Sequence, residues 1–364
     1  MDEAVKNYRM PVTVLTGFLG SGKTTLLNHW LQNPALSDAA VIVNEFGEIG
    51  IDHALIASSN DQTLQLTTGC LCCTIQGDLV NTLRNLTQLR AQGAVAAFSR
   101  VLIETTGLVD PIPVLQSLMT HPVAATYRLA QVITAVDAFN GEATLVAHRE
   151  AQRQLMVADQ IVITKTDLVR KDVAGSLAAQ LKSLNPGAQQ HLSTQASFPP
   201  ATLMLEDDIY AFEAKPQVVF DWLKAERHLK HDGLIKRRGH RHLDGLNTFC
   251  IYLDRPMLWE HIAAWLDALV IAHGEDLLRI KGLVNIKGRS RPIVLQAVQK
   301  LFHPPAELAA WPDEDQRSRI VFITKNLAKD YVWQVLDVIL SRSISTADES
   351  LLYSPNQEDH ENSY

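Results

Sequence analysis

The chain has 364 residues, a formal net charge of −7 and 46% hydrophobic residues. This composition is ordinary for a globular protein that buries a core, and the length suggests two domains. The mild acidity argues against a nucleic-acid-binding protein, because phosphate backbones attract basic surfaces.

The first ten residues lack the apolar core of a secretory signal, and no later stretch has the roughly 18 apolar residues of a membrane helix. We therefore expect a cytoplasmic protein with no membrane partner. Four cysteines do not form a disulfide scaffold in a chain of this length. Their clustering instead suggests metal or redox chemistry.

From residue 11 to about 190, short β-branched runs alternate with helical stretches. This alternation predicts an α/β domain with a mainly parallel sheet, which binds ligands at the carboxyl ends of its strands. The predicted strands are 12–16, 40–44, 64–66, 100–104, 128–136 and 160–164. The predicted helices are 24–32, 77–92, 114–119, 147–157 and 173–184.

The periodicity then fades, and residues 191–246 are predicted to be a linker. It contains scattered histidines that are interpreted either as part of a solvated linker or as weak metal ligands: His228, His231, His240 and His242. Residues 247–344 are predicted to form a small α+β domain. Its expected strands are 247–253, 278–286, 292–301 and 318–324, and its expected helices are 257–271 and 329–340. Residues 1–10 are interpreted as an N-terminal extension and 345–364 as a disordered tail.

Residues 17–24 read G-F-L-G-S-G-K-T and match the phosphate-loop pattern G-x-x-x-x-G-K-[ST] in full, between a predicted strand and a predicted helix. The glycines let backbone N–H groups face a phosphate chain, and the helix N-terminus adds to the attraction. In this pattern the lysine reaches the β- and γ-phosphates and the threonine hydroxyl binds Mg²⁺. The predicted nucleotide-binding residues of this loop are Gly17, Gly20, Ser21, Gly22, Lys23, Thr24 and Thr25.

The predicted strand 100–104 ends in Glu104 and is followed by Thr-Thr-Gly. An acid at this strand tip can hold Mg²⁺ directly or through water, so Thr24 and Glu104 are expected to share a magnesium site. Lys23 and Glu104 are the expected catalytic residues, and the backbone of Gly107 is expected to approach the γ-phosphate. Taken alone, an ordinary strand end explains Glu104 equally well, but the phosphate loop upstream favours the functional interpretation.

Residues 164–167 read T-K-T-D and resemble the N-K-x-D guanine signature. A carboxylate at Asp167 can accept hydrogen bonds from guanine N1 and N2, which adenine does not offer, and Lys165 would lie along the base. We therefore expect GTP rather than ATP, with the strictness left open because Thr164 replaces Asn. A simple helix N-cap at Thr166 or Asp167 is the alternative interpretation.

Three thiols follow Gly69 within four residues: Cys70, Cys72 and Cys73. Thiolates favour Zn²⁺, Cu(I) or iron–sulfur chemistry over Mg²⁺. A structural zinc site has four ligands, so three local cysteines predict an exchangeable site, and Glu48 is a candidate fourth donor. The alternatives are a redox pair, because Cys70 and Cys73 have C-x-x-C spacing, or buried thiols, which is the interpretation of Cys250.

The cysteines lie between the phosphate loop and the Glu104 strand, where nucleotide switches keep segments that respond to the γ-phosphate. We therefore expect hydrolysis to change the geometry around the thiolates and to release the ion.

Together these motifs resemble the CobW-like family of metal-chaperone P-loop GTPases, over nearly the whole chain from residue 11 to about 340. The residues that carry the resemblance are 17–25, 44–48, 69–73, 104–107, Asp137, Glu150, Gln154, 158–159, 165–167, 279–282 and 318–322.

The resemblance implies a GTPase that uses GTP, Mg²⁺ and Zn²⁺ (or Co²⁺) and delivers the transition metal to a client metalloprotein. It assigns the metal site to Cys70, Cys72 and Cys73 and a metal role to Glu48. Relatives often self-associate, so a homo-oligomer is a possible assembly. Two features depart from the family: Thr164, and the absence of a long histidine-rich loop.

Other functions compete with zinc delivery. One is an accessory role in cobalt insertion for cobalamin synthesis or in nitrile hydratase activation. Another is a nucleotide-bound zinc buffer or sensor that delivers nothing. A small-molecule kinase gives no reason for the cysteine cluster, and a redox sensor predicts a reversible Cys70–Cys73 disulfide.

Overall fold

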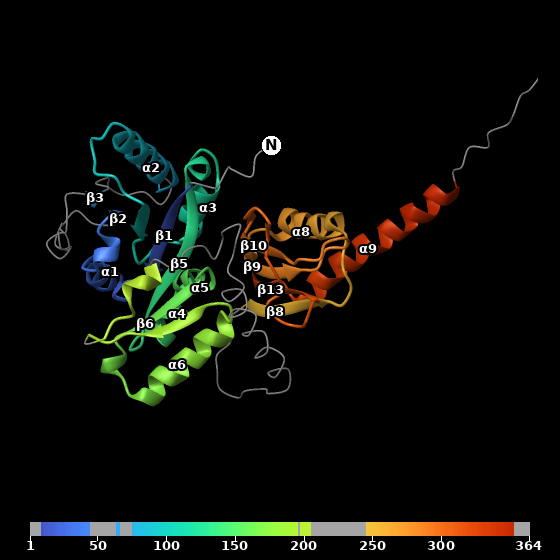
Figure 1. The fold of residues 1–364 in the computed structure, drawn as a ribbon. Coiled ribbons are helices and arrows are strands. Elements are labelled where there is room, and N and C mark those ends of the chain that lie inside the picture. The colour runs from blue at the N-terminus through green and yellow to red at the C-terminus, as the bar shows by residue number, and fades with distance from the viewer. Residues whose placement is uncertain (1–8, 44–62, 66–74, 196, 205–244, 353–364) are drawn as a thin grey trace, which may run out of the picture.

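The computed structural model describes residues 9–43, 63–65, 75–195, 197–204 and 245–352. Two β-sheets lie side by side in it, one formed before residue 193 and the other after residue 245 (Figure 1). The cysteines at 70, 72 and 73, Glu48 and the four histidines between 228 and 242 lie outside the described residues.

The first sheet has seven strands in the order β3-β2-β4-β1-β5-β6-β7, and every neighbouring pair is parallel. The predicted α/β class with a mainly parallel sheet is therefore confirmed. Its strands are β1 (Met10–Gly17), β2 (Ala39–Val43), β3 (Thr63–Gln65), β4 (Arg100–Glu104), β5 (Tyr127–Asp137), β6 (Gln160–Thr164) and β7 (Gln189–Leu192). Its helices are α1 (Lys23–Leu31), α2 (Ile75–Ala91), α3 (Ile112–Met119), α4 (Gly141–Ala147), α5 (Arg149–Met156) and α6 (Lys171–Leu184).

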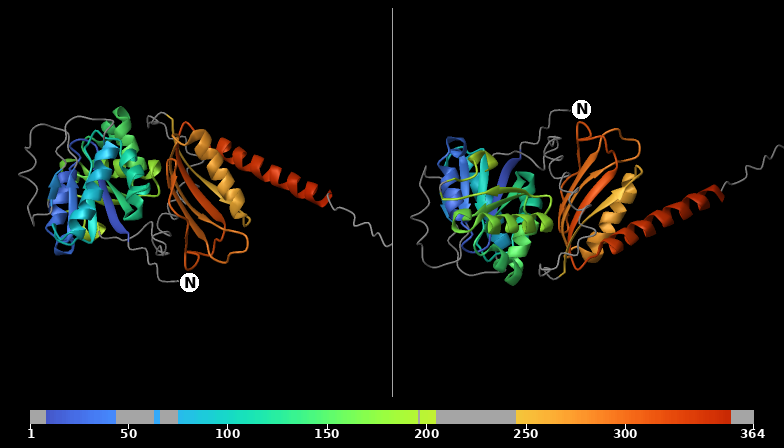
Figure 2. Two further views of the ribbon diagram at one scale, coloured as in Figure 1. Left: turned by 90° about the horizontal axis from the view of Figure 1, so that it is seen from above. Right: turned by 90° about the horizontal axis from the view of Figure 1, so that it is seen from below.

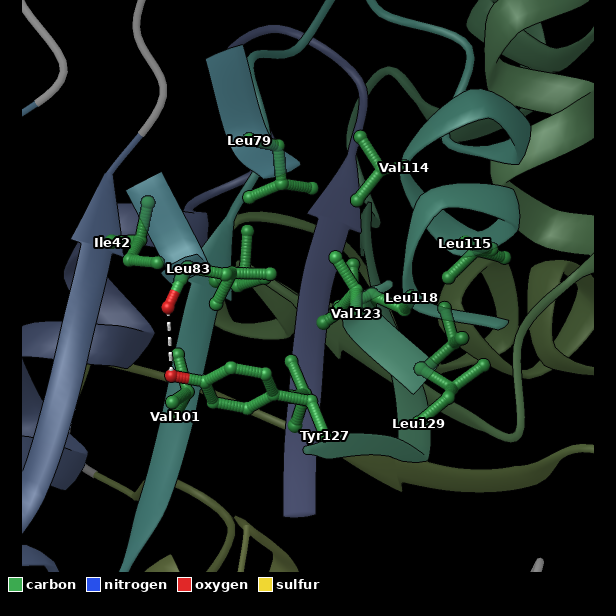
Figure 3. Close-up of a cluster of buried hydrophobic side chains, with 14 of the residues drawn as sticks. Ile42, Leu79, Leu83, Val101, Val114, Leu115, Leu118, Val123, Tyr127 and Leu129 are labelled. Carbon is green, nitrogen blue, oxygen red and sulfur yellow. Dashed lines mark hydrogen bonds between the residues drawn. The ribbon is translucent and has the colours of Figure 1, made fainter. Parts of the chain in front are cut away.

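Both faces of this sheet are covered, so its strands are apolar on both sides, as buried parallel strands require. Val14 of β1 packs with α2 and α3, whereas Leu15 packs on the opposite face with α1. Figure 3 shows the first of these clusters, with Leu83 of α2 facing Tyr127 of β5. The Tyr127 hydroxyl donates to the Leu83 carbonyl over 3.1 Å, so the buried phenol is hydrogen-bonded, and burial raises its pKa.

The second sheet is antiparallel, with strand order β11-β10-β9-β13-β8 and β12 beside β10. Its strands are β8 (Leu246–Leu253), β9 (Leu277–Val284), β10 (Ile293–Val298), β11 (Leu301–Phe302), β12 (Ala306–Glu307) and β13 (Ser318–Lys325). Helices α8 (Trp259–His273) and α9 (Lys329–Leu352) lie on the face turned away from the first domain (Figure 2). The predicted α+β character of this region is confirmed.

Side chains of β9 alternate between the two faces of this sheet, as the pleat dictates. Ile280 packs with Trp265 of α8 and Phe322 of β13 in the core beneath the helices. Arg279 and Lys281 point the other way and contact the first domain. One face of the sheet therefore builds the core of the second domain, and the other face joins the two domains.

Several predicted boundaries were wrong. The predicted helix 147–157 corresponds to α5, which begins only at Arg149 because the backbone of His148 is extended (φ −126°, ψ 122°), and α4 before it was not predicted. The polar edge strand β7 lies across the predicted start of the linker, because strand pairing with β6 overrides its weak apolar signal. The predicted strand 292–301 is divided into β10 and β11 at Gln299, which has a φ of 51°.

The C-terminal helix is longer than predicted. Helix α9 continues to Leu352, beyond the predicted helix end at residue 340, and residues 353–364 lie outside the described residues. No glycine or proline interrupts the chain between Leu340 and Pro355. No helix in the described part of the chain is long and apolar enough to cross a membrane. Cys250 on β8 is buried, as predicted.

Candidate nucleotide site

The phosphate loop joins β1 to α1 at the carboxyl edge of the parallel sheet. Gly17, Gly20 and Gly22 have φ angles of 140°, 71° and 86°, which a residue with a Cβ rarely adopts. Gly22 caps the N-terminus of α1 without a side chain, so no side chain of its own covers the first N–H groups of the helix. The loop therefore has the curled backbone that the motif predicts.

Two side-chain oxygens that could bind a metal ion meet beside this loop. The Thr24 hydroxyl donates to Glu104 Oε1 over 2.6 Å, although 80 positions separate the two residues in sequence. Glu104 is 4% exposed at the end of β4, the strand next to β1. Because both groups offer hard oxygen atoms, the pair has the chemistry that Mg²⁺ prefers.

The loop after β4 lies directly against the phosphate loop. A Cβ on Gly107 would stand 2.5 Å from the backbone N and Cα of Leu19, a separation that no real side chain tolerates. The Thr105 hydroxyl donates to the Thr16 hydroxyl over 2.8 Å, and the Thr105 N–H donates to the Leu15 carbonyl over 3.0 Å. These contacts fix residues 105–107 at the edge where a terminal phosphate would lie.

Lys165 occupies the other end of the site. Its backbone is left-handed (φ 55°), and its Nζ donates to Asp137 Oδ2 over 2.8 Å. Burial raises the pKa of Asp137, but the hydrogen bond and charge of Lys165 and the bond from the Phe139 N–H outweigh burial and hold that pKa below its usual value. Asp137 is therefore an ionised partner that orients the lysine.

Thr164, which departs from the guanine signature, has a structural contact of its own. Its buried hydroxyl donates to the Ser21 carbonyl over 2.7 Å, and its 3.3 Å contact with the Val136 carbonyl is longer. The side chain therefore connects the phosphate loop to β6, directly before Lys165. A threonine can thus hold these two loops together from the first position of the signature.

A cleft of about 760 Å³ extends across these elements. It is lined by the predicted site residues Gly20, Gly22, Lys23, Thr24, Thr25, Glu104, Gly107 and Lys165. The cleft also includes residues that the sequence analysis did not single out: Asn28, His29, Gln32 and Phe198. Phe198 stacks on His29 with ring centroids 4.1 Å apart. No motif marks Phe198, because it reaches α1 from a segment predicted to be a linker.

Three predicted nucleotide-binding residues do not line this cleft: Gly17, Ser21 and Asp167. Ser21 instead lines a smaller pocket behind the loop, and Asp167 is exposed in the 3₁₀ turn Thr166–Leu168. Within the described residues, no group of three or more His, Cys, Asp or Glu side chains could hold a metal ion. The predicted thiolate site lies outside that part of the chain.

Comparisons with known proteins agree with this geometry. Residues 11–191 match the family described as CobW/HypB/UreG, nucleotide-binding domain, and residues 246–340 match the cobalamin synthesis protein cobW C-terminal domain. The chain belongs to the CobW/HypB/UreG family of P-loop GTPases. The resemblance inferred from the sequence motifs is confirmed.

Relatives in this family match the chain over most of its length. The zinc chaperone YjiA of Escherichia coli is 31% identical over 88% of this chain and 96% of its own. The zinc chaperone CobW of Pseudomonas aeruginosa is 30% identical, with 88% of each chain covered. The crystal structure of Zn(II)-bound YjiA GTPase from E. coli matches with a TM-score of 0.64 at 26% identity, covering 91% of this chain and 99% of that one.

Within this CobW/HypB/UreG GTPase, the cleft brings together a curled phosphate loop, a hydroxyl–carboxylate pair and a second loop that touches the first. Lys23 is 7% exposed, and its Nζ lies 3.3 Å from the Phe18 carbonyl of the loop. The ammonium group is thereby kept within the loop, where it can neutralise charge on a bound phosphate.

Proposed function

We propose that this protein hydrolyses GTP bound with Mg²⁺ in the cleft and couples hydrolysis to the delivery of a transition metal, Zn²⁺ or alternatively Co²⁺, to a client metalloprotein. The observation that carries the nucleotide part is the 2.6 Å contact between Thr24 and Glu104 beside the phosphate loop. Bound Mg²⁺ would neutralise charge on the β- and γ-phosphates, and Thr24 and Glu104 would hold it.

The other residues of the cleft have distinct roles in this proposal. Lys23 and the backbone N–H groups of residues 17–25 bind the phosphates, and the backbone at Gly107 faces the terminal phosphate. Lys165, oriented by Asp137 at 2.8 Å, lies along the base, and Asp167 accepts hydrogen bonds from guanine. The nucleotide therefore spans from α1 to the end of β6.

The metal part of the proposal rests on the soft ligands Cys70, Cys72 and Cys73, with Glu48 as a further donor. It is supported by two relatives named zinc chaperones that match 88% of this chain. Both ligand segments fall between α1 and β4, the two elements that supply Thr24 and Glu104. In the sequence the thiolates therefore lie between the two elements that would hold Mg²⁺, so a change at the γ-phosphate can be passed along the chain to them.

The proposal is tested by GTP and ATP hydrolysis with and without Zn²⁺, in the wild type and in Cys72→Ser. We expect faster hydrolysis of GTP than of ATP, and a zinc effect on the wild type that Cys72→Ser lacks. Cys250→Ala is the matched control, since this cysteine is buried in β8, and it should retain the zinc effect. If zinc leaves the rate of GTP hydrolysis unchanged in all three proteins, the proposed coupling between zinc binding and hydrolysis is contradicted.

Delivery is tested separately with a zinc-sensitive dye as acceptor. The protein loaded with GTP should release zinc to the dye at the rate of hydrolysis, and the same protein with a non-hydrolysable GTP analogue should retain it. Equal release with both nucleotides would leave a zinc buffer rather than a delivery protein.

A further inference from the structure

Helix α5 lies between the nucleotide cleft and the second domain, and one of its side chains holds the loop that follows β4. Gln154 is fully buried, and its Nε2 donates to the Gly107 carbonyl over 3.1 Å and to the Val109 carbonyl over 3.0 Å. The carbonyl and N–H of a trans peptide point in opposite directions. Fixing the Gly107 carbonyl from behind therefore also fixes the N–H of Leu108, a residue that lines the cleft.

Helix α5 contacts this loop at a second point, and a hydrogen bond from β5 holds the helix to the sheet. Arg153, next to Gln154, forms an ion pair with Asp110. The Thr134 hydroxyl of β5 donates to the Gln154 carbonyl over 2.8 Å. Loop 107–110 is thus attached to two successive residues of a helix that cannot shift without breaking a buried hydrogen bond.

The chain after α5 is bound to the second domain. Five positions beyond Gln154, Asp159 Oδ1 accepts from Arg279 Nη2 over 2.6 Å and lies 2.8 Å from Lys281 Nζ. All three side chains are buried, and Asp159 Oδ2 also accepts from the Val132 N–H over 2.9 Å. A buried carboxylate between two cations of another domain resists displacement, because moving it would leave charges unpaired.

Hydrogen bonds also hold the backbone between Gln154 and Asp159. Asn185 Nδ2 donates to the Leu155 carbonyl over 2.9 Å and to the Ala158 carbonyl over 3.0 Å, and Asn185 is 2% exposed. Asn185, a residue of the first domain, therefore holds the turn between α5 and β6 in place. A shift of Asp159 would be carried into α5 rather than absorbed between them.

We propose that Gln154 is a positioning residue for GTP hydrolysis, and that the segment from Gln154 to Asp159 makes the hydrolysis rate depend on how the second domain is docked. Gln154 sets the backbone of loop 107–110 at the terminal phosphate, and the Asp159 cluster with Arg279 and Lys281 holds α5 in place. This inference rests on the proposed GTP hydrolysis and adds a connection from the cleft to the second sheet.

The first test compares two glutamines on the same helix. Gln154→Glu replaces the donor with a carboxylate that repels both carbonyls, and we expect kcat to fall about tenfold with KM for GTP within about threefold, because misplaced groups act on the transition state. Gln152→Glu is the matched control, since Gln152 donates over 2.8 Å to the Leu145 carbonyl, away from the loop, and it should retain the wild-type kcat. If Gln154→Glu does not fold, Gln154→Met removes the donor at similar length.

A kcat within about twofold of wild type in a folded Gln154 variant would overturn the positioning role. Equal losses in Gln152→Glu and Gln154→Glu would also overturn it, because the effect would then belong to the helix as a whole. A wild-type protein that hydrolyses no GTP would instead contradict the proposed function itself.

The second test addresses the second domain. Asp159→Asn should lower kcat about fivefold, and combining it with Gln154→Met should lower kcat no further than Gln154→Met alone, as expected for residues that act through one element. Thr248→Val is the control, because it removes a different contact between the domains, the 2.7 Å bond from the Thr248 hydroxyl to the Leu184 carbonyl. If Asp159→Asn does not fold, Lys281→Met removes one partner instead. Losses that multiply in the double variant, or equal losses in Thr248→Val, would overturn the connection.

Discussion

Glu104 and Asp159 are both buried carboxylates at the ends of strands in one parallel sheet, yet the structure surrounds them differently. Glu104 closes β4 at the carboxyl edge, beside the Thr24 hydroxyl and a cleft of about 760 Å³. Asp159 precedes β6 at the opposite edge, where Arg279 and Lys281 of the second domain cover it. The carboxyl edge is left open to a ligand, and the amino edge is occupied by protein cations.

This difference shows what a buried carboxylate contributes in each place. At the cleft, a charge that can be neutralised by a ligand cation makes a binding site. Between the domains, the cations are permanent, so the same group fixes one docking arrangement. Such a cluster adds little net stability compared with apolar packing but is costly to break. Four experiments test the roles of the cleft and of the contact between the domains.

The largest effect on activity is expected at the cleft. Thr24→Val removes the hydroxyl that contacts Glu104 and should lower kcat/KM for GTP about 100-fold, the loss expected when a group that orients transition-state charge is removed. Thr24→Ser keeps the hydroxyl and should retain most activity. Phosphate release at several Mg²⁺ concentrations measures both, and a Thr24→Val enzyme as active as Thr24→Ser would contradict the magnesium assignment.

Between the domains, the expected loss is in stability. Asp159→Asn removes the charge between two buried cations and should lower the free energy of unfolding by about 3 kcal/mol, the lower end of the cost of breaking a buried pair. Urea unfolding followed by tryptophan fluorescence measures it. Replacing Asp159, Arg279 and Lys281 together with apolar residues should recover part of the loss, and no recovery would mean that the charges themselves are not the cause.

The region between the domains should also respond to pH. Burial, reinforced by the charge of Arg279, lowers the pKa of His303 from 6.5 to about 3, with Asp159 opposing this shift and Arg9 and Lys281 adding to it. Because the folded state resists protonation, stability is intact above pH 6.5 and falls as the pH decreases towards 3. The loss between pH 6.5 and pH 5 should be about 1.5 kcal/mol.

Urea unfolding of the wild type and of His303→Gln at both pH values measures this loss. The variant should show a smaller decrease, whereas His121→Gln, at an exposed position, should behave like the wild type. An identical decrease in all three proteins would assign the pH dependence to other groups.

The smallest effect is expected where the protein would contact the guanine base. Asp167 is exposed, so Asp167→Asn should raise KM for GTP by about tenfold with kcat nearly unchanged, because only ground-state contacts to guanine are lost. The same variant should use xanthosine triphosphate better than the wild type does, since xanthine offers an acceptor at C2 where guanine offers a donor. A GTP KM equal to that of the wild type would favour the helix-cap interpretation of this residue.

The cleft could be predicted closely from the sequence, because its residues are contiguous in motifs whose geometry is local. The glycines of residues 17–24 favour a curled backbone, and Glu104 ends an apolar strand of the kind that is buried inside a parallel sheet. The close approach of the Thr24 hydroxyl to Glu104, at 2.6 Å, was expected because the carboxyl ends of parallel strands and the loops that follow them meet at one edge of the sheet.

Other features could not be predicted. Phe198 enters the cleft from a segment without periodicity, and β7 is a polar strand whose signal is weak until β6 pairs with it. Helix α4 was not predicted, and the extended backbone of His148 that separates it from α5 has no local signal in the sequence. In each case the deciding interaction comes from residues far away in the chain, so a local pattern has no information about it.

The parallel sheet, the phosphate loop, the approach of Thr24 to Glu104 and the family could be inferred without coordinates, because each is carried by short motifs whose chemistry and spacing are local. The contacts of Gln154 with the Gly107 and Val109 carbonyls, and those of Asp159 with Arg279 and Lys281, became evident only in the folded chain. Those contacts depend on how a helix and two sheets dock. Docking is set by packing and charge pairing summed over distant segments, which no short stretch of sequence encodes.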